Sequence, residues 1–291
     1  MTPVSFPAPT LILWAATVRA RSLTDRLIVG QTSGCTEQSV FPDHITNWLA
    51  KGQTLTQIRE QARVGGVPIT ILDPLTRWLP NWRLPAYMNA EERAFQETDQ
   101  NTFFEYAAGL QVKKMSVIDG IGARVDLSEI VLAFERMCDK ARELGMLVQV
   151  EFMPFGSIPD LATAWEIVRR ANRENGGLVF DTYHYFRGYP DPNLLAQLPG
   201  EKVFAVQASD AGTAIQGGSL YADQMHFRQE PGQGNFPLIE IIRTLRAIGG
   251  LRNVGAELFS DEADRLTPAV LGAQVGEALR QLLNAAEEEP A

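Results

Sequence analysis

The chain has 291 residues, of which 45% are hydrophobic and 21% charged, a balance that supports a sizeable globular core and excludes a disordered chain. Its 35 acidic residues outnumber its 26 basic residues and give a net charge of −9, which disfavours nucleic acid as a partner. Cys35 and Cys138 fit neither a disulfide framework nor a clustered metal motif, and residues 1–22 lack both a signal-peptide charge pattern and the length of a membrane span, so we expect a cytoplasmic protein that binds no membrane.

Eight short runs of apolar and β-branched residues follow one another along the chain, and each is a candidate strand. They cover residues 11–18, 36–41, 67–73, 112–119, 147–153, 177–183, 202–209 and 253–259. Segments with helical spacing of apolar residues lie between them, most clearly at 127–145, 161–177, 237–250 and 267–285. The first helix, between residues 22 and 34, is poorly marked.

Strands that alternate with helices, without a linker rich in Pro, Gly or Ser, predict an α/β protein with a (β/α)₈ TIM barrel fold. We expect a single domain over residues 1–291 that ends in a short acidic tail at 286–291. A doubly wound sheet is the competing architecture, but no GxGxxG turn follows the first strand. In a barrel, the side chains that carry chemistry are expected at the carboxyl ends of the strands.

Polar side chains lie near the ends of the last four predicted strands. These residues are Glu151 in LVQVEFM, Asp181 in GLVFDTY, Gln207 in KVFAVQAS and Glu257 in NVGAELF. A single acid at such a place is more often a helix cap or a turn residue. Three acids that converge in a barrel mouth, however, repel one another unless a cation or protons compensate their charge. We therefore predict that these four oxygen-bearing side chains bind a divalent metal, with Mn²⁺ or Mg²⁺ favoured and Co²⁺ or Zn²⁺ not excluded.

Histidine and arginine side chains follow the same strands. His184 comes three residues after Asp181, and His226 lies in a polar segment after the seventh strand, so we expect both to contact the substrate. His184 is also a candidate catalytic residue, and it could instead donate a hydrogen bond to a carboxylate that binds the metal. Arg187 and Arg228 are further candidates because a guanidinium group suits a carboxylate or an anionic intermediate. For Arg187, a solvated surface position is equally compatible with the sequence.

The loop at 73–85 after the third strand is rich in tryptophan and proline. One interpretation is an apolar lid that contains Trp78 and Trp82 and covers a substrate larger than a free sugar. Packing against the barrel rim or against an oligomer partner is the alternative. The sequence leaves both open.

These motifs resemble the sugar phosphate isomerase/epimerase superfamily of xylose-isomerase-like TIM barrels, over residues 112–259. VEFMPF, FDTYH, VQASDA and AELFSDE are similar to its motifs on strands five to eight, and RQEPGQGNFP is similar to its arginine followed by PGxG. The resemblance implies that the metal ligands are Glu151, Asp181, Gln207 and Glu257. It also implies acid/base roles for Glu151 and Glu257 and substrate contacts for His184 and Arg228. Many members have a histidine as the seventh-strand ligand, so Gln207 leaves the identity of the metal open.

The resemblance implies a metal-dependent isomerase or epimerase that removes a proton next to the carbonyl of a sugar or polyhydroxy-ketone and passes through an enediolate. A dehydratase of the dehydroshikimate or inosose type shares this first step and stays open, as does a non-catalytic binding barrel. Only three histidines and an acidic charge disfavour a related endonuclease, and a Schiff-base aldolase would need Lys113 or Lys114. The expected partner is a small polyol, ketose or cyclic hydroxy-ketone; whether the chain forms a homo-oligomer stays open.

Overall fold

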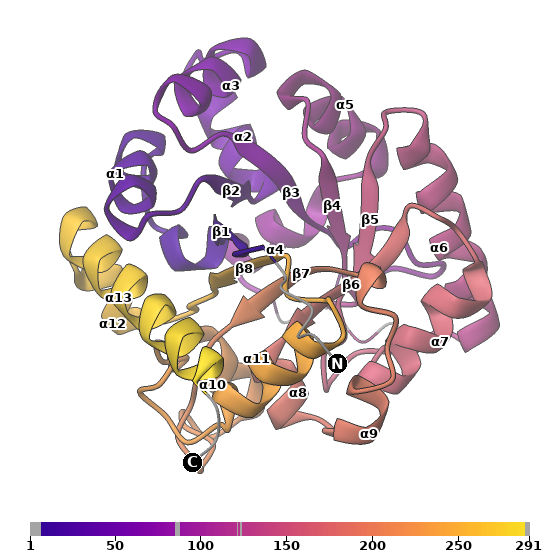
Figure 1. Ribbon diagram of the computed structural model, residues 1–291. Coiled ribbons are helices and arrows are strands. Elements are labelled where there is room, and N and C mark those ends of the chain that lie inside the picture. The colour runs from indigo at the N-terminus through magenta and orange to yellow at the C-terminus, as the bar shows by residue number, and fades with distance from the viewer. Residues whose placement is uncertain (1–6, 85–87, 121, 123, 289–291) are drawn as a thin grey trace.

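Eight parallel strands close into a barrel in the computed structural model, which describes residues 7–84, 88–120, 122 and 124–288 (Figure 1). The strands are β1 (Thr10–Leu13), β2 (Glu37–Val40), β3 (Ile69–Leu75), β4 (Lys114–Val117), β5 (Leu147–Val150), β6 (Gly176–Asp181), β7 (Val203–Ala208) and β8 (Asn253–Ala256). They pair in sequence order, and β1 pairs with β8 to close the ring. The predicted (β/α)₈ barrel is therefore confirmed.

Helices surround the barrel and connect its strands (Figure 1). They are α1 (Leu23–Ser33), α2 (Pro42–Ala50), α3 (Leu55–Val64), α4 (Ala90–Glu97), α5 (Gln100–Leu110), α6 (Leu127–Arg142), α7 (Leu161–Ala171), α8 (Thr182–Arg187), α9 (Pro192–Leu195), α10 (Leu220–His226), α11 (Leu238–Ala247), α12 (Asp261–Arg265) and α13 (Pro268–Glu287), with 3₁₀ turns at Ala15–Val18 and Gly200–Lys202. None of the helices formed by the described residues combines the length and apolar character needed to cross a bilayer.

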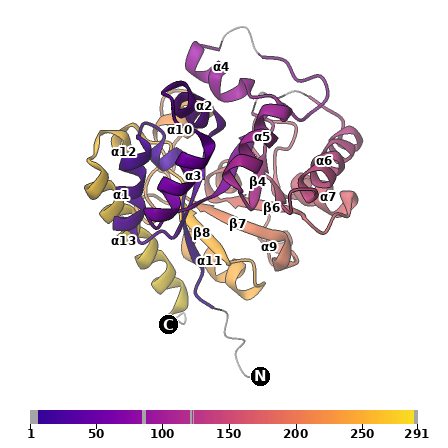
Figure 2. The same cartoon turned by 90° about the horizontal axis from the view of Figure 1, so that it is seen from above.

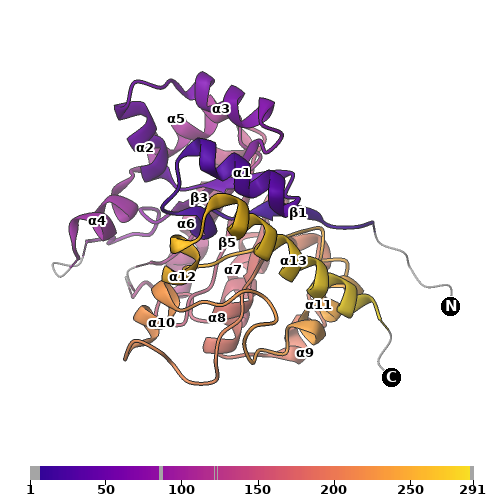
Figure 3. The same cartoon turned by 90° about the vertical axis from the view of Figure 1, so that its left-hand side faces the viewer.

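The two ends of the described chain meet at one seam of the ring, where α13 packs against α1 (Figure 3). The poorly marked first helix does form, because Ser22 caps its start by accepting a hydrogen bond from the Asp25 amide. At the other end of the chain, α13 continues through Glu287, so the predicted acidic tail at 286–291 begins inside this helix. Residues 289–291 of that tail lie outside the described residues.

Several strands end earlier than the sequence pattern predicts. The first run was expected to be a strand through Val18, but residues 15–18 form a 3₁₀ turn. The sixth run turns into helix α8 directly after Asp181, because the Asp181 carboxylate accepts a hydrogen bond from the His184 amide at 3.1 Å and caps the helix. His184 therefore lies in the first turn of a helix and not on a strand. Glu151 and Glu257 follow the last residues of β5 and β8 instead of lying inside those strands.

An apolar layer fills the barrel below the site. This layer is one cluster of buried side chains from β1, β3, β6 and β7 and from the residue just after β1. Since these strands are not all neighbours in the ring, the side chains must meet inside the barrel. They are Ile12, Trp14, Ile71, Val179 and Ala205. Side chains two residues apart on a strand point to the same face. Asp73, Asp181 and Gln207 follow members of this layer by two residues and therefore form the next layer toward the carboxyl ends of the strands.

Short helices gather at the end of the barrel where the strands finish. In the side view of Figure 3, α4, α10 and α12 lie at the left, whereas the start of β1 and the end of α13 lie at the right. Figure 2 shows α4 at the outer edge of the molecule beside α2, which it contacts. A hydrogen bond of 2.9 Å from the Tyr221 hydroxyl to Glu92 joins α10 to α4. These helices form the walls around the polar layer.

Candidate active site

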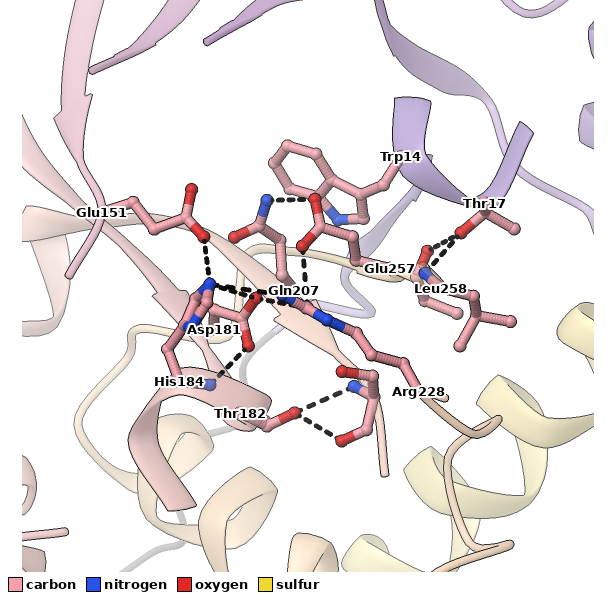
Figure 4. A network of polar contacts seen from close by, with 12 residues as sticks. Trp14, Thr17, Glu151, Asp181, Thr182, His184, Gln207, Arg228, Glu257 and Leu258 are labelled. Carbon is pink, nitrogen blue, oxygen red and sulfur yellow. Dashed lines mark hydrogen bonds and ion pairs between the residues drawn. The ribbon is translucent and has the colours of Figure 1, made fainter. Parts of the chain in front are cut away.

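The polar layer brings six predicted site residues into direct contact (Figure 4). They are buried side chains from β6, β7, α8, the residues just after β5 and β8, and the loop before α11: Glu151, Asp181, His184, Gln207, Arg228 and Glu257. The segments that supply them lie up to about a hundred residues apart in the sequence, and only the closed barrel makes them neighbours. The six residues that the sequence groups as one site therefore lie together in the structure.

Arg228 is the central cation of the cluster. Its Nη1 donates to Asp181 Oδ2 at 2.7 Å and to Glu257 Oε2 at 3.0 Å, and its Nη2 lies 3.2 Å from His184 Nε2. The guanidinium group also lies over the rings of Tyr183 and Phe259, at 4.5 and 5.2 Å from their centroids. A buried arginine with this many partners is held in one orientation, and it offsets part of the charge of the three acids.

His184 is a neutral imidazole in this environment. Its Nε2 lies 3.3 Å from Glu151 Oε1 and 3.7 Å from Asp181 Oδ2. Burial lowers the pKa of His184 to about 3; Arg228 adds to this effect, whereas Asp181 opposes it. The ring can therefore accept a hydrogen bond or bind a metal through a nitrogen, but it does not carry a positive charge near neutral pH.

The three acids of the cluster differ in their ionisation. Burial raises the pKa of Glu151 and of Glu257 well above the usual range of a glutamate, and the charges of Asp181 and Asp73 add to both shifts, whereas Arg228 opposes them. Burial acts in the same direction on Asp181, but the charge and the hydrogen bond of Arg228 oppose it, and the pKa of Asp181 lies below its ordinary value. Asp181 is thus the acid whose ionised form Arg228 stabilises, and the two glutamates are the acids whose protonated form burial favours.

The donor atoms of the cluster fit a divalent cation. Ligand atoms of Glu151, Asp181 and His184 all lie within 4.8 Å of one another. Gln207 donates from Nε2 to Glu257 Oε1 at 2.7 Å, which leaves its buried Oε1 without a partner. An unpartnered amide oxygen beside three carboxylates is a suitable hard ligand. The geometry therefore groups Glu151, Asp181 and His184 as candidate ligands, and His184 is not in the ligand set that the sequence predicts. Glu257 and Gln207 stay predicted ligands.

The loop that carries Arg228 is anchored by Asp210. This carboxylate accepts hydrogen bonds from the amides of Gly232 at 3.1 Å and Phe236 at 2.9 Å, and the Asp210 backbone pairs with Gln229. A Cβ on Gly234 would lie only 2.3 Å from Asp210 Oδ1 and 2.4 Å from the Ala211 carbonyl oxygen. The PGQG sequence thus lets the loop wrap closely around Asp210, and this wrapping holds Arg228 over the cluster.

A cavity of about 700 Å³ opens above the cluster and reaches the short helices. Glu151, His184, Arg228 and Glu257 lie in its lining. Another part of the lining is aromatic and consists of Phe41, Phe95, Phe155 and Phe259. The Phe41 ring packs edge-on against Phe95 and stacks on Phe259, at 5.1 and 6.2 Å between centroids. The cavity therefore joins a charged floor to an apolar wall, an arrangement suited to a small ring-shaped ligand.

The other predicted substrate contacts lie outside the buried cluster. His226 lines the cavity where it opens to solvent, and its Nδ1 is 2.9 Å from Asp261 Oδ1. Arg187 donates from Nε to Asp223 Oδ2 at 2.9 Å and from Nη2 to the Gly212 carbonyl at 2.9 Å, so it ties α8 to the loop after β7. Arg187 is not among the described residues that line the cavity.

The tryptophans of the third loop do not form a lid over the cavity. The indole of Trp78 is buried, donates to the Ile118 carbonyl at 2.8 Å and packs against Phe134. Trp82 lies against the Arg77 guanidinium. Neither is among the described residues that line the cavity, so the packing interpretation of these tryptophans replaces the lid.

Asp73 is a lining residue that sequence reasoning did not select. It lies in β3 and is buried, and burial raises its pKa to about 6, with Asp181 adding to the shift and a hydrogen bond from Ser116 opposing it. The signal was present, because Asp73 closes the apolar run VPITILD just as Asp181 closes GLVFD. The predicted site residues all come from the last four strands and their loops, whereas Asp73 lies on the third.

A model of the xylose isomerase-like TIM barrel family matches residues 37–287. The chain belongs to this family. It is 26% identical to a 3-dehydroshikimate dehydratase of Pseudomonas putida over 236 residues, which are 80% of this chain and 35% of the dehydratase. It is also 26% identical to an inosose isomerase of Bacillus velezensis over 190 residues, 62% of this chain and 66% of the isomerase. The chain thus spans only about a third of the length of the dehydratase.

Solved structures show the same barrel. The IolI protein with a bound zinc atom superimposes with a TM-score of 0.79 and 22% identity, over 96% of this chain and all of the IolI chain. At this identity the likeness shows a shared fold. The chain thus belongs to the xylose isomerase-like TIM barrels, and the relatives that it matches are named as a dehydratase and an isomerase.

Proposed function

We propose that this chain is a divalent-metal-dependent isomerase or epimerase that acts on a neutral sugar or cyclic polyhydroxy-ketone by removing a proton next to the carbonyl. The observation that carries this proposal is the pair of buried glutamates, Glu151 and Glu257, which line one cavity and share a raised pKa. A glutamate whose pKa is raised is a stronger base than an ordinary glutamate, and two such groups can remove a proton and return one.

The residues of the cluster divide the work between them. The proposed ligands are the carboxylates of Glu151, Asp181 and Glu257 and the amide oxygen of Gln207, with His184 beside the first two. A divalent ion bound there would polarise the substrate carbonyl and stabilise the negative charge that develops on its oxygen. One glutamate removes the α-proton, and reprotonation of the opposite face gives an epimer, whereas reprotonation of the neighbouring carbon gives an isomer. Arg228 holds Asp181 and Glu257 in place and adds positive charge near the reacting oxygens.

The charge of the cavity supports a neutral substrate. Among the described residues, its lining contains seven acids: Asp43, Asp73, Glu92, Glu151, Glu257, Asp261 and Asp264. The two arginines in the described lining, Arg19 and Arg228, are both bonded to carboxylates, and Arg19 donates to Asp264 at 2.8 Å and to Asp261 at 3.0 Å. A substrate carboxylate or phosphate would meet repulsion here, with only a bound metal to attract it.

A dehydratase is the second candidate function, because the relative that matches 80% of this chain is named 3-dehydroshikimate dehydratase. Proton abstraction next to a carbonyl is common to both reactions, and loss of a β-hydroxyl in place of reprotonation makes the product unsaturated. The acidic lining counts against dehydroshikimate itself, because that substrate carries a carboxylate. We further propose that the protein works in the cytoplasm, in keeping with its two buried free cysteines.

Metal titration tests the metal dependence of this proposal. The protein is stripped with EDTA and titrated with Mn²⁺, Mg²⁺, Co²⁺ and Zn²⁺ by calorimetry and thermal unfolding. We expect one divalent ion to bind per chain and to stabilise the fold by about 2.7 kcal/mol at a free concentration one hundred times the Kd. Asp181→Asn should lose this stabilisation, whereas the matched change Asp139→Asn in an exposed ion pair on α6 should keep it. A chain that binds none of the four ions, or an Asp181→Asn variant that binds them normally, would contradict the proposal.

A further inference from the structure

Asp73 faces the proposed metal ligands from the opposite side of the barrel. In a ring of eight strands paired in sequence order, β3 lies across from β7, which carries Gln207. Asp73 lines the same cavity as Glu151 and Glu257, and its charge acts on both glutamates. A ligand that contacts the cluster on one side of the cavity therefore has Asp73 on its other side.

The two oxygens of Asp73 have different environments. Gln149 donates from Nε2 to the Ser116 hydroxyl oxygen at 3.0 Å, and a hydrogen bond from Ser116 lowers the pKa of Asp73 against the effect of burial. The second oxygen, Oδ1, has no hydrogen-bond partner, although only 2% of the residue is exposed. A buried carboxylate oxygen without a donor is costly, so the site is built to receive one.

Two further acceptors of the same kind line the cavity. The side-chain oxygens Oε1 of Gln96 on α4 and of Gln224 on α10 are buried and have no partner. Together with Asp73, they supply acceptors from three separate elements around one space. Hydroxyl groups arranged around a ring can donate to acceptors that approach from several sides. The aromatic wall formed by Phe41 and its neighbours suits the apolar face of such a ring.

We propose that Asp73 is a specificity-determining residue of this cavity and that its free Oδ1 accepts a hydrogen bond from a ring hydroxyl of a neutral cyclic polyol or polyhydroxy-ketone. The choice of ligand class rests on the proposed function. The hydrogen-bonding role of Asp73 does not rest on the proposed function, because a ring that carries hydroxyl groups can bind there without reacting. A hydrogen bond from a neutral hydroxyl to an ionised carboxylate is charge-assisted and is among the stronger polar contacts.

Binding of myo-inositol tests this inference, because this polyol has a full set of ring hydroxyls and no carbonyl that could react. Calorimetry with saturating Mn²⁺ compares the wild type with Asp73→Asn and Asp73→Ala. We expect each variant to weaken myo-inositol binding about 10- to 100-fold. Asp119→Asn is the matched control: this acid is also buried, one strand further along, but its carboxylate accepts from the Ser157 amide at 2.6 Å and it is not among the described lining residues. It should bind within twofold of the wild type.

The inference and the proposed function fail in different ways. If Asp73→Ala binds myo-inositol as tightly as the wild type does, or if the wild type does not bind it, the role of Asp73 is overturned whatever the activity. Solvent deuterium uptake by a cyclic polyhydroxy-ketone, measured separately, reports on the proposed function alone. Loss of myo-inositol binding in both Asp73 variants, with native thermal unfolding curves, supports the inference even if no deuterium is taken up.

Discussion

Arg228 explains how this chain can bury three acids so close together. Its guanidinium group bonds to Asp181 and Glu257 and contacts His184, while Glu151 is left with the neutral imidazole as its neighbour. Burial raises the pKa of both glutamates, and the nearby anions, which one cation does not compensate, add to the shift. This excess of negative charge supports the proposal that the cluster binds a divalent ion.

Removal of this cation should destabilise the metal-free protein. Arg228→Ala leaves buried carboxylates unpaired, and breaking a buried ion pair typically costs about 3–5 kcal/mol. We expect urea unfolding to show a loss of this size, with partial recovery when Mn²⁺ is added. The control is Arg280→Ala, which breaks an exposed ion pair with Glu277 and should change the stability by less than about 1 kcal/mol. An Arg228→Ala protein as stable as the wild type would show that the acids do not need the guanidinium group.

Asp73 should make the stability of the metal-free protein depend on pH. Because its folded-state pKa is raised from 3.8 to about 6, the folded state holds the proton more tightly, and stability falls as the pH rises through this window. Asp73→Asn removes the titrating group. The variant should therefore match the wild type near pH 3.8, gain on it up to about pH 6 and keep a constant advantage above that. Thermal unfolding across this range measures the difference, and a constant offset at all pH values would count against the raised pKa.

At the scale of elements, two devices place the site residues. Asp181 ends β6 and caps α8, which sets His184 one helical turn away from it. Asp210 gathers the amides of the following loop and thereby fixes the segment that carries Arg228. Both devices use a carboxylate at a strand end as a structural anchor. An aspartate at the end of a strand can thus belong to the candidate site, as Asp181 does, or hold a loop in place, as Asp210 does.

The close fit around Asp210 gives a test of this loop. Gly234→Ala would place a Cβ 2.3 Å from Asp210 Oδ1, so the loop must shift, at a typical cost of about 1–3 kcal/mol for overpacking. We expect a lower melting temperature and a loss of proton exchange activity as Arg228 moves. Gly212→Ala lies in the same polar region, where nothing lies within 4 Å of an added Cβ, and should behave like the wild type. Equal effects of the two changes would argue against the anchoring role of Asp210.

The sequence predicted the barrel and the convergence of its strand ends because both follow from local patterns. Alternating apolar runs predict the strands, and parallel strands in a closed ring bring their carboxyl ends together. The sequence could not predict that Arg228 lies between Asp181 and Glu257, since this depends on how the loop folds around Asp210. Nor could it separate Trp78, which packs in the core, from the phenylalanines that line the cavity. Such choices depend on three-dimensional packing that no spacing records.

For the whole molecule, the charge distribution suits the proposed chemistry. The chain has a net charge of −9, and seven of its acids lie in the described lining of one cavity. The two arginines of that lining are already bonded to carboxylates. Such a cavity attracts divalent cations and repels anionic ligands. The fold thus provides an acidic floor, an aromatic wall and unpartnered hydrogen-bond acceptors around one space.

Solvent deuterium uptake at the α-carbon of a cyclic polyhydroxy-ketone tests the central claim most directly. Scyllo-inosose is incubated in D₂O with the Mn²⁺-loaded protein and followed by NMR, with Glu151→Gln and Glu257→Gln alongside. We predict that the wild type incorporates deuterium next to the carbonyl and that the loss of either glutamate slows incorporation about 10²- to 10⁴-fold. Should neither this compound nor a ketose panel exchange a proton faster with the wild type than with the two variants, the assignment of Glu151 and Glu257 as proton-transfer groups would be contradicted.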